Sequence, residues 1–94
     1  MSAEDRIAVS ARLAGGHWRR LGHDLADGRR DPATLAALHE HCAALAADAA
    51  ALGWAETERY ALHLAALAAD GAPEMPPDFC QIIASGLIGW AEGR

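Results

Sequence analysis

Four runs of apolar residues, spaced three and four apart and separated by glycine and proline, constrain the fold of this chain most strongly. This spacing places the apolar side chains on one face of an α-helix. Alanine, the strongest helix former, provides 24 of the 94 residues, whereas valine and isoleucine, which favour strands, number five together. No segment alternates apolar and polar residues as a strand would. The sequence therefore predicts an all-α fold.

Each predicted helix has a recognisable beginning or end. Ser2 and Asp5 form a capping-box pattern for the first helix, and Asp31-Pro32 is the strongest helix start in the chain. Glycines, such as Gly53 and Gly71, follow the ends of the first three helices. We expect helices over about 3–27, 32–52, 55–70 and 78–92, with Gly15-Gly16 as a place where the first can kink. Segment 72–77 has three prolines and cannot lie inside a helix or strand.

The very short link between the second and third predicted helices forces an antiparallel hairpin. A chain of 94 residues has room for one core, so we expect a single helical domain over 1–94. The predicted architecture is an antiparallel up-down four-helix bundle. The apolar sides of its last two helices, expected to face inward, consist of Tyr60, Leu64 and Leu67 in the third and Phe79, Ile82, Ile83, Leu87 and Trp90 in the fourth.

Charge is distributed unevenly along the chain, whose net charge is −5. Residues 1–30 hold six of the eight arginines against four acidic residues, and residues 31–94 hold two arginines against nine. An acidic chain has no general attraction to phosphate backbones, and the N-terminal arginines are interleaved with carboxylates. These features argue against nucleic acid as a partner.

The first residues, MSAEDRIAV, have neither the basic nor the apolar segment of a secretion signal. The longest apolar run near the C-terminus, 82–91, is far too short to span a bilayer, so no membrane partner is expected. The two cysteines are expected to be reduced thiols in a cytoplasmic protein. An apolar fraction of 52%, together with an exposed tryptophan, predicts a homodimer.

The first helix of the predicted hairpin begins with DPATL at 31–35 and closes with AALAADAAALG at 43–53. In these two motifs it resembles histidine-phosphotransfer (Hpt) domains. In that family a phospho-accepting histidine is followed by x-Leu-Lys-Gly-Ser and, further on, by Leu-Gly; residues 43–53, AALAADAAALG, share the length and the final Leu-Gly. The motif DPATL at 31–35 is similar to the start of the family's active-site helix. The resemblance covers roughly residues 31–70. The positions where the family places Leu, Cys and Leu on the next helix are Tyr60, Ala61 and Leu64.

The functional residues of the Hpt family are absent from the matching positions. The phospho-accepting position falls on Ala43, the lysine position on Ala46, the glycine position on Ala47 and the serine position on Asp48. Phosphotransfer needs an exposed imidazole as nucleophile and a nearby cation for the phosphoryl oxygens, and a methyl group supplies neither. We therefore predict a non-catalytic adaptor or regulator that binds a signalling protein, such as a receiver domain or a kinase, through this surface.

Two further residues belong to the expected partner surface. His39 lies one helical turn before Ala43, and Trp54 follows the Gly53 turn, where a side chain can stay exposed. An exposed tryptophan is a frequent anchor of protein interfaces. The sequence thus places the partner site on the second predicted helix and its following turn.

An active phosphorelay intermediate is the alternative interpretation. His39 is followed by Glu40, which resembles the His-Glu pair in the dimerisation helices of sensor kinases, and His23-Asp24 is similar. Phosphorylation of His39 or His23 would then replace the missing histidine at position 43. Labelling with a phosphodonor distinguishes this alternative from an inactive adaptor.

A metal-binding bundle is a third interpretation. His39 and Cys42 lie three residues apart on one helix, and the hairpin sets His63 roughly opposite them. With Cys80 or Glu40 as a fourth ligand, this set suits a tetrahedral ion. However, no recognised metal-binding spacing is present, and Cys42 lies on the apolar stripe, where a thiol behaves as a small hydrophobe. We therefore expect no metal and no cofactor.

Other catalytic patterns are missing from the sequence. Neither Ser10 nor Ser85 has a base in fixed relation to it, and the chain has no phosphate-binding glycine loop. Glu56 and Glu58 fall at a predicted helix N-terminus, where the helix dipole accounts for them. The prediction is that the protein is not an enzyme.

Overall fold

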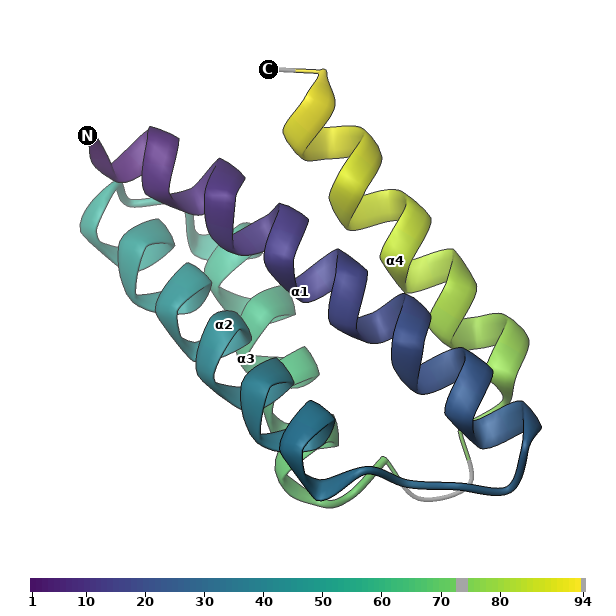
Figure 1. The fold of residues 1–94 in the computed structure, drawn as a ribbon. Helices are drawn as coiled ribbons and strands as arrows, with labels where there is room; N and C mark the ends of the chain where they lie inside the picture. The colour runs from purple at the N-terminus through teal and green to yellow at the C-terminus, as the bar shows by residue number, and fades with distance from the viewer. Residues whose placement is uncertain (73–74, 94) are drawn as a thin grey trace.

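The computed structural model describes residues 1–72 and 75–93, and these form an all-α four-helix bundle (Figure 1). The helices are α1 (Ala3–Ala26), α2 (Pro32–Ala51), α3 (Ala55–Ala69) and α4 (Pro77–Glu92). The predicted fold class is confirmed, and the helix bounds agree with those predicted to within one residue. In the predicted non-helical segment 72–77, residues 73 and 74 lie outside the described residues. Ala72, Met75 and Pro76 are not helical, whereas Pro77 is the first residue of α4, where a proline is well accommodated. Over the described part of the chain, no helix has the length and apolarity needed to cross a membrane.

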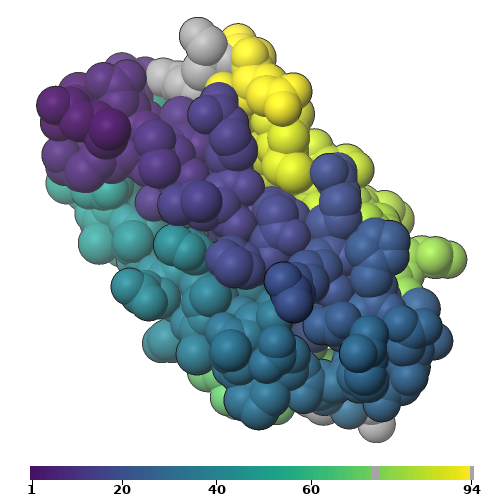
Figure 2. Space-filling view, in the orientation of Figure 1, coloured from purple at the N-terminus to yellow at the C-terminus, as the bar shows by residue number. Residues whose placement is uncertain are grey.

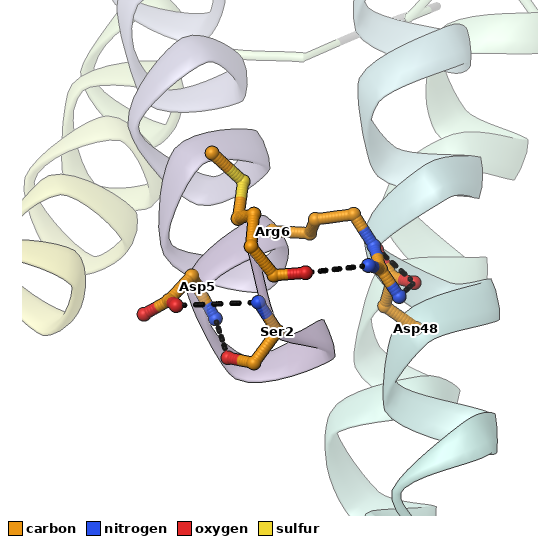
Figure 3. Close-up of polar contacts among 5 residues, drawn as sticks. Ser2, Asp5, Arg6 and Asp48 are labelled. Carbon is orange, nitrogen blue, oxygen red and sulfur yellow. Dashed lines mark hydrogen bonds and ion pairs between the residues drawn. The ribbon is translucent and has the colours of Figure 1, made fainter.

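The N-terminal caps of α1 and α2 are those that the sequence predicts. Ser2 Oγ accepts a hydrogen bond from the Asp5 backbone N–H at 3.1 Å, and the Asp5 carboxylate accepts one from the Ser2 N–H (Figure 3). These contacts with Ser2 lower the pKa of Asp5. Asp31 accepts from the Ala33 N–H at 3.0 Å at the start of α2. Each cap satisfies backbone donors that the first helical turn leaves unpaired.

The turn between α2 and α3 depends on the left-handed backbone of Gly53, which has φ 75°. The Gly53 N–H donates to the Ala50 carbonyl and the Trp54 N–H to the Ala49 carbonyl, at 3.1 and 2.9 Å. This pair of hydrogen bonds is a Schellman motif, which ends a helix sharply and is best accommodated by glycine. The chain therefore reverses within a few residues, and α2 and α3 form the predicted antiparallel hairpin.

Helix α1 lies between α4 and the α2–α3 hairpin (Figure 1). In the space-filling view its side chains cross one face of the molecule diagonally, with α2 on one side and α4 on the other (Figure 2). Among the described residues, no Cα atom of α3 comes within 8 Å of one in α4. The order around the bundle is therefore α4, α1, α2, α3, and the ring of helices is open between its two ends.

The central position of α1 follows from its sequence. Five of its residues form a fully buried stripe: Ile7, Ala11, Ala14, Trp18 and Leu21. Beside this stripe, a Cβ atom on Gly15 would lie 2.5 Å from Ile88 Cγ1 and 3.1 Å from the Ala84 carbonyl oxygen of α4. A side chain at position 15 would push the two helices apart. The helix runs through Gly15 and Gly16 without interruption, so Gly15 serves close packing within a continuous helix.

Candidate functional site

The opening between α3 and α4 is an apolar groove with a volume of about 370 Å³. Its floor consists of Ile7 and Ala11 from α1 and of Cys42 and Leu45 from α2. The residues that form its two walls are Glu56, Thr57, Tyr60, Ala61 and Leu64 on α3, and Gly86, Leu87 and Trp90 on α4. Because all four helices contribute, the groove exists only in the assembled bundle.

The volume of the groove indicates what can enter it. It lies in the range of pockets that bind ligands. One turn of a helix about 10 Å in diameter fills roughly 400 Å³. The groove therefore accommodates the apolar side chains from one face of a helix, while the helix backbone stays above it.

Cys42 on the groove floor is buried, and burial raises the pKa of its thiol to about 11. The indole N–H of buried Trp18 counteracts part of this effect. The contact between the two side chains is weak, because Trp18 Nε1 has no hydrogen-bond partner of regular geometry among the described residues. At neutral pH the thiol stays protonated and is a poor nucleophile, so Cys42 contributes apolar surface to the floor.

Large apolar side chains of α3 and α4 remain exposed to solvent. The exposed fractions are 48% for Tyr60, 47% for Phe79, 68% for Ile82 and 38% for Trp90. On α4, Phe79, Ile82, Gly86 and Trp90 follow one another at spacings of three, four and four residues, so they share one face. Trp90 of this face and Tyr60 of α3 line the groove, and exposed apolar surface of this kind is one that proteins use for binding.

These four residues correct a prediction from the sequence. The sequence predicted all four on inward faces, together with Leu64, Ile83 and Leu87. The structure buries Leu64, Ile83 and Leu87 and leaves the other four exposed. The physical reason is the separation of α3 and α4: apolar residues that face each other across the opening have no partner helix. The apolar face of α4, from Phe79 to Trp90, is wider than contact with α1 alone requires. This excess width was the sequence signal for the groove.

Trp54 lies at one end of the same opening, where α3 begins. It is half-buried, and its ring meets that of Trp90 edge to face, with 6.4 Å between the ring centroids. Of the expected partner-surface residues, Trp54 is therefore the one that is associated with the groove. Its contact fixes the orientation of the Trp90 ring on the opposite wall.

The other expected partner residues are on α2, on the far side of the hairpin from α4. Ala47 is exposed and Ala43 half-buried on the outer face of α2, whereas Ala46 is buried with 3% exposure. The side chain of Ala46 therefore contributes to the core. His39 is exposed, and its Nδ1 lies 3.2 Å from the Ala65 carbonyl oxygen of α3, to which it can donate. The structure thus brings Ala43 and Ala47 together at the surface and leaves Ala46 inside.

Asp48, the fourth residue of the Hpt-like motif, is held by α1. Its Oδ1 accepts hydrogen bonds from Arg6 Nε and Nη2, both at 3.2 Å, and Arg6 also donates to the Met1 carbonyl (Figure 3). In the second half of α1, His17 stacks on His41 of α2 with 5.3 Å between the ring centroids. Both contacts join α1 to α2 at the edge of the core.

The structure does not bring together the side chains that the metal-binding interpretation requires. Cys42 is buried in the groove floor, His63 is exposed on α3, and Cys80 is buried on α4. Within the described ranges, no group of three or more His, Cys, Asp or Glu side chains is placed to hold a metal ion. The three-residue spacing of His39 and Cys42 directs one side chain outward and the other into the core.

A second hollow, of about 420 Å³, lies where α1 ends and α2 begins. Its lining is charged and consists of Arg20, Asp24, Arg29, Arg30 and Asp31. Arg29 is paired with Asp24 and Asp27 at 3.6 and 3.2 Å, and Arg30 donates to the Ala72 carbonyl. These contacts hold the α1–α2 connection, and the groove is the better candidate for binding.

Comparison with known proteins gives no match to a family model, to a curated protein or to a solved structure. The function of the chain must therefore be inferred from its own residues.

Proposed function

We propose that this chain is a small protein-binding module, without a reaction of its own, that holds a helix of a partner protein in the groove between α3 and α4. The observation that carries the proposal is the apolar groove itself, built by all four helices and lined by the exposed side chains of Tyr60 and Trp90, with exposed Phe79 and Ile82 on the same face of α4 as Trp90. Laying the apolar face of an amphipathic helix into such a groove is a common mode of recognition.

The burial of apolar surface favours a partner helix over water as the occupant of the groove. Each aromatic residue that a partner covers removes apolar surface from solvent, at about 25 cal/mol per Å². Tyr60 and Trp90 are residues of the kind that dominate binding energy at interfaces, and they stand on opposite walls of the groove. A helix lying between them would contact both and complete the ring of helices.

The resemblance to Hpt domains suggests a role as an adaptor or regulator in signalling, with a receiver domain or kinase as the partner. The surface that this resemblance indicates, around Ala43 to Asp48, is weaker support than the groove. Its exposed side chains are mainly alanine methyl groups, which bury little area, and the Asp48 carboxylate is already held by Arg6. We therefore place the principal binding site in the groove.

A neutral amphipathic peptide tests the proposed function. The probe is an 18-residue helix with leucine at positions i, i+3, i+4 and i+7, and glutamine and alanine elsewhere. It is added to ¹⁵N-labelled protein, and amide shifts are followed by NMR. Shifts concentrated on the groove faces of α3 and α4 would support the proposal. Absence of binding, or shifts confined to the outer face of α2, would refute it.

A variant that fills the groove provides the matched control. Gly86 lines the groove, and a Cβ atom there would have no neighbour within 4 Å, so the side chain of Gly86→Leu can extend from an open position into the groove. Gly89 on the same helix has the same free space but is not part of the lining. We expect Gly86→Leu to weaken peptide binding at least about tenfold and Gly89→Leu to leave it near the wild-type value. Circular dichroism confirms that both variants are folded.

Phosphorylation on His39 or His23 remains the second candidate function, because both side chains are exposed in the structure. Incubation with a phosphodonor and an assay for acid-labile phosphate decides it. We expect no stoichiometric labelling. Labelling that is lost in His39→Gln or in His23→Gln alone would instead establish an active phosphorelay intermediate.

A further inference from the structure

We infer that the groove selects a basic amphipathic helix, in which an arginine or lysine is placed to reach Glu56 between the rings of Tyr60 and Trp90. This inference rests on the proposed function, since it specifies the chemistry of the helix that the groove binds. Three observations lead to it: the charge of the groove walls, the surroundings of Glu56 and the dimensions of the opening.

The helices that form the two walls of the groove carry an excess of negative charge. Within the described residues, helices α3 and α4 contain Glu56, Glu58, Asp78 and Glu92, with one arginine, Arg59, and one histidine, His63. The positive charge of the chain is concentrated in residues 1–30 instead. In that region α1 contributes to the groove only through its apolar floor residues Ile7 and Ala11. A partner lying between α3 and α4 therefore meets apolar surface below and the carboxylate of Glu56 on the α3 wall.

Among the described residues, Glu56 is the one charged residue that lines the groove itself. Its carboxylate is exposed and has no hydrogen-bond or ion-pair partner among the described residues. Its place in the first turn of α3 stabilises the helix through the dipole, and this role leaves the carboxylate oxygens available to a ligand. A cation from the partner would form an ion pair with this carboxylate.

Tyr60 and Trp90 line the groove together with Glu56. The ring of Trp90 is held edge to face by Trp54, which limits its motion. The faces of aromatic rings attract a cation through their quadrupole, and a nearby carboxylate adds to this attraction. An arginine or lysine side chain also has an aliphatic stem that can lie along the apolar wall below its charge.

Charge also argues against a second copy of this chain as the occupant. A two-fold contact would place the net negative helices α3 and α4 of one protomer against the same helices of the other, and like charges across an interface oppose association. Helices α3 and α4 are 15 and 16 residues long, so each spans about 22 to 24 Å, and the lining residues 56–64 extend along about 12 Å of α3. A partner helix that inserts the side chains of two or three turns, with an arginine or lysine beside its apolar stripe, matches the groove and the charge of Glu56.

Three peptides test this inference. They share the leucine stripe of the neutral probe and differ only on the polar face, which carries lysine and arginine, glutamine, or glutamate. Affinities are measured by fluorescence anisotropy at about 50 mM salt. We expect the basic peptide to bind about tenfold more tightly than the neutral one and the acidic peptide to bind most weakly. Equal affinities for all three would overturn the inference while leaving helix binding intact, whereas no binding by any peptide would refute the proposed function.

The variant Glu56→Gln tests whether Glu56 causes the preference for the basic peptide, and Glu58→Gln is its control. Glu58 lies in the same turn of α3 and has the same charge, but it does not line the groove. We expect Glu56→Gln to reduce the basic-to-neutral affinity ratio to about two or less without changing the affinity for the neutral peptide, and Glu58→Gln to preserve most of the ratio. An equal loss of this affinity ratio in both variants would overturn the assignment to Glu56, because it would indicate a general electrostatic attraction to the negative charge of α3.

Sedimentation completes the test against the competing occupant. In place of the homodimer that the composition predicts, we expect the chain to remain monomeric at about 50 mM salt, where repulsion between the acidic helices α3 and α4 of two copies is only weakly screened. A dimer at this salt concentration that Gly86→Leu disrupts and Gly89→Leu does not would identify a second copy as the occupant. That result would overturn the inference.

Discussion

Gly15 and Gly16 are adjacent in α1, yet the structure gives them opposite roles. Gly15 faces α4, where a Cβ atom would meet Ile88 and the backbone of Ala84 at 2.5 to 3.1 Å. Gly16 faces solvent, and a Cβ atom there would have nothing within 4 Å. Both lose the same amount of backbone freedom on folding. Only at Gly15 is this loss offset by closer packing of two helices.

Alanine substitutions at these two glycines should therefore change stability in opposite directions. Gly16→Ala is expected to raise the free energy of unfolding by about 0.5–1 kcal/mol, because alanine is the better helix former. Gly15→Ala is expected to lower it by about 1–3 kcal/mol, because the methyl group forces α1 and α4 apart. Urea unfolding followed by circular dichroism measures both. A stabilising Gly15→Ala would mean that Ile88 moves aside without cost.

The contact between α1 and α2 combines an aromatic pair with an ion pair at the edge of the core. His17 stacks on His41, and partial burial lowers the pKa of His17, with smaller contributions from the nearby charges of His41 and Arg20. Arg6 reaches Asp48 about three turns closer to the N-terminus of α1. These polar contacts make the α1–α2 interface sensitive to pH and salt.

Acid should weaken the bundle through His17. Because its pKa is lowered in the folded state, the unfolded chain binds the proton more readily, and protonation favours unfolding. The contribution of His17 is therefore fully present above the ordinary pKa of 6.5 and is lost as the pH falls below it. We expect the free energy of unfolding to decrease from pH 7 to pH 5, and less so in His17→Gln. In His63→Gln, at an exposed position on α3, the wild-type pH dependence should persist.

The Arg6–Asp48 ion pair should contribute little to stability. The Arg6 side chain is 49% exposed, so the charges are well screened by water. We expect Asp48→Asn to lower the free energy of unfolding by less than about 1 kcal/mol at low salt, and the difference to shrink in about 1 M sodium chloride. A loss that persists at high salt would instead indicate that Asp48 acts through packing.

The order of the helices makes the outer members, α3 and α4, less secure than the inner members, α1 and α2. Helix α2 has two neighbours, α1 and α3, whereas α4, within the described residues, packs against α1 alone. Detaching α4 therefore disrupts one interface, and detaching α2 disrupts two. Local opening that costs less free energy than global unfolding is expected at α4 before α2.

The two buried cysteines report on this difference. Cys42 is on α2 and Cys80 on α4, and burial raises the pKa of both thiols. We expect iodoacetamide to modify both slowly in the native protein, and Cys80 faster than Cys42, because opening of α4 suffices to expose Cys80. Mass spectrometry of peptides after timed alkylation measures the two rates. Equal rates would show that the bundle opens only as one cooperative unit.

Much of the fold follows from local chemistry that the sequence displays. Asp31-Pro32 starts α2 because a capping carboxylate and a proline satisfy its first turn, and Gly53 ends it because glycine tolerates a left-handed backbone. Apolar residues at helical spacing then determine that these helices pack together. Interactions between near neighbours in the chain are sufficient for these features, so the helix bounds and the all-α class could be predicted.

The candidate site depended on the tertiary structure. The sequence drew attention to His39, Cys42 and Ala43, but it could not show that α3 and α4 stay apart, because helix order around a bundle depends on contacts between distant residues. Gly15 brings α4 onto α1, and that contact leaves Tyr60 and Trp90 on opposite walls of an open groove. The sequence thus determined the helices and their apolar faces, whereas long-range packing decided which apolar face remained uncovered.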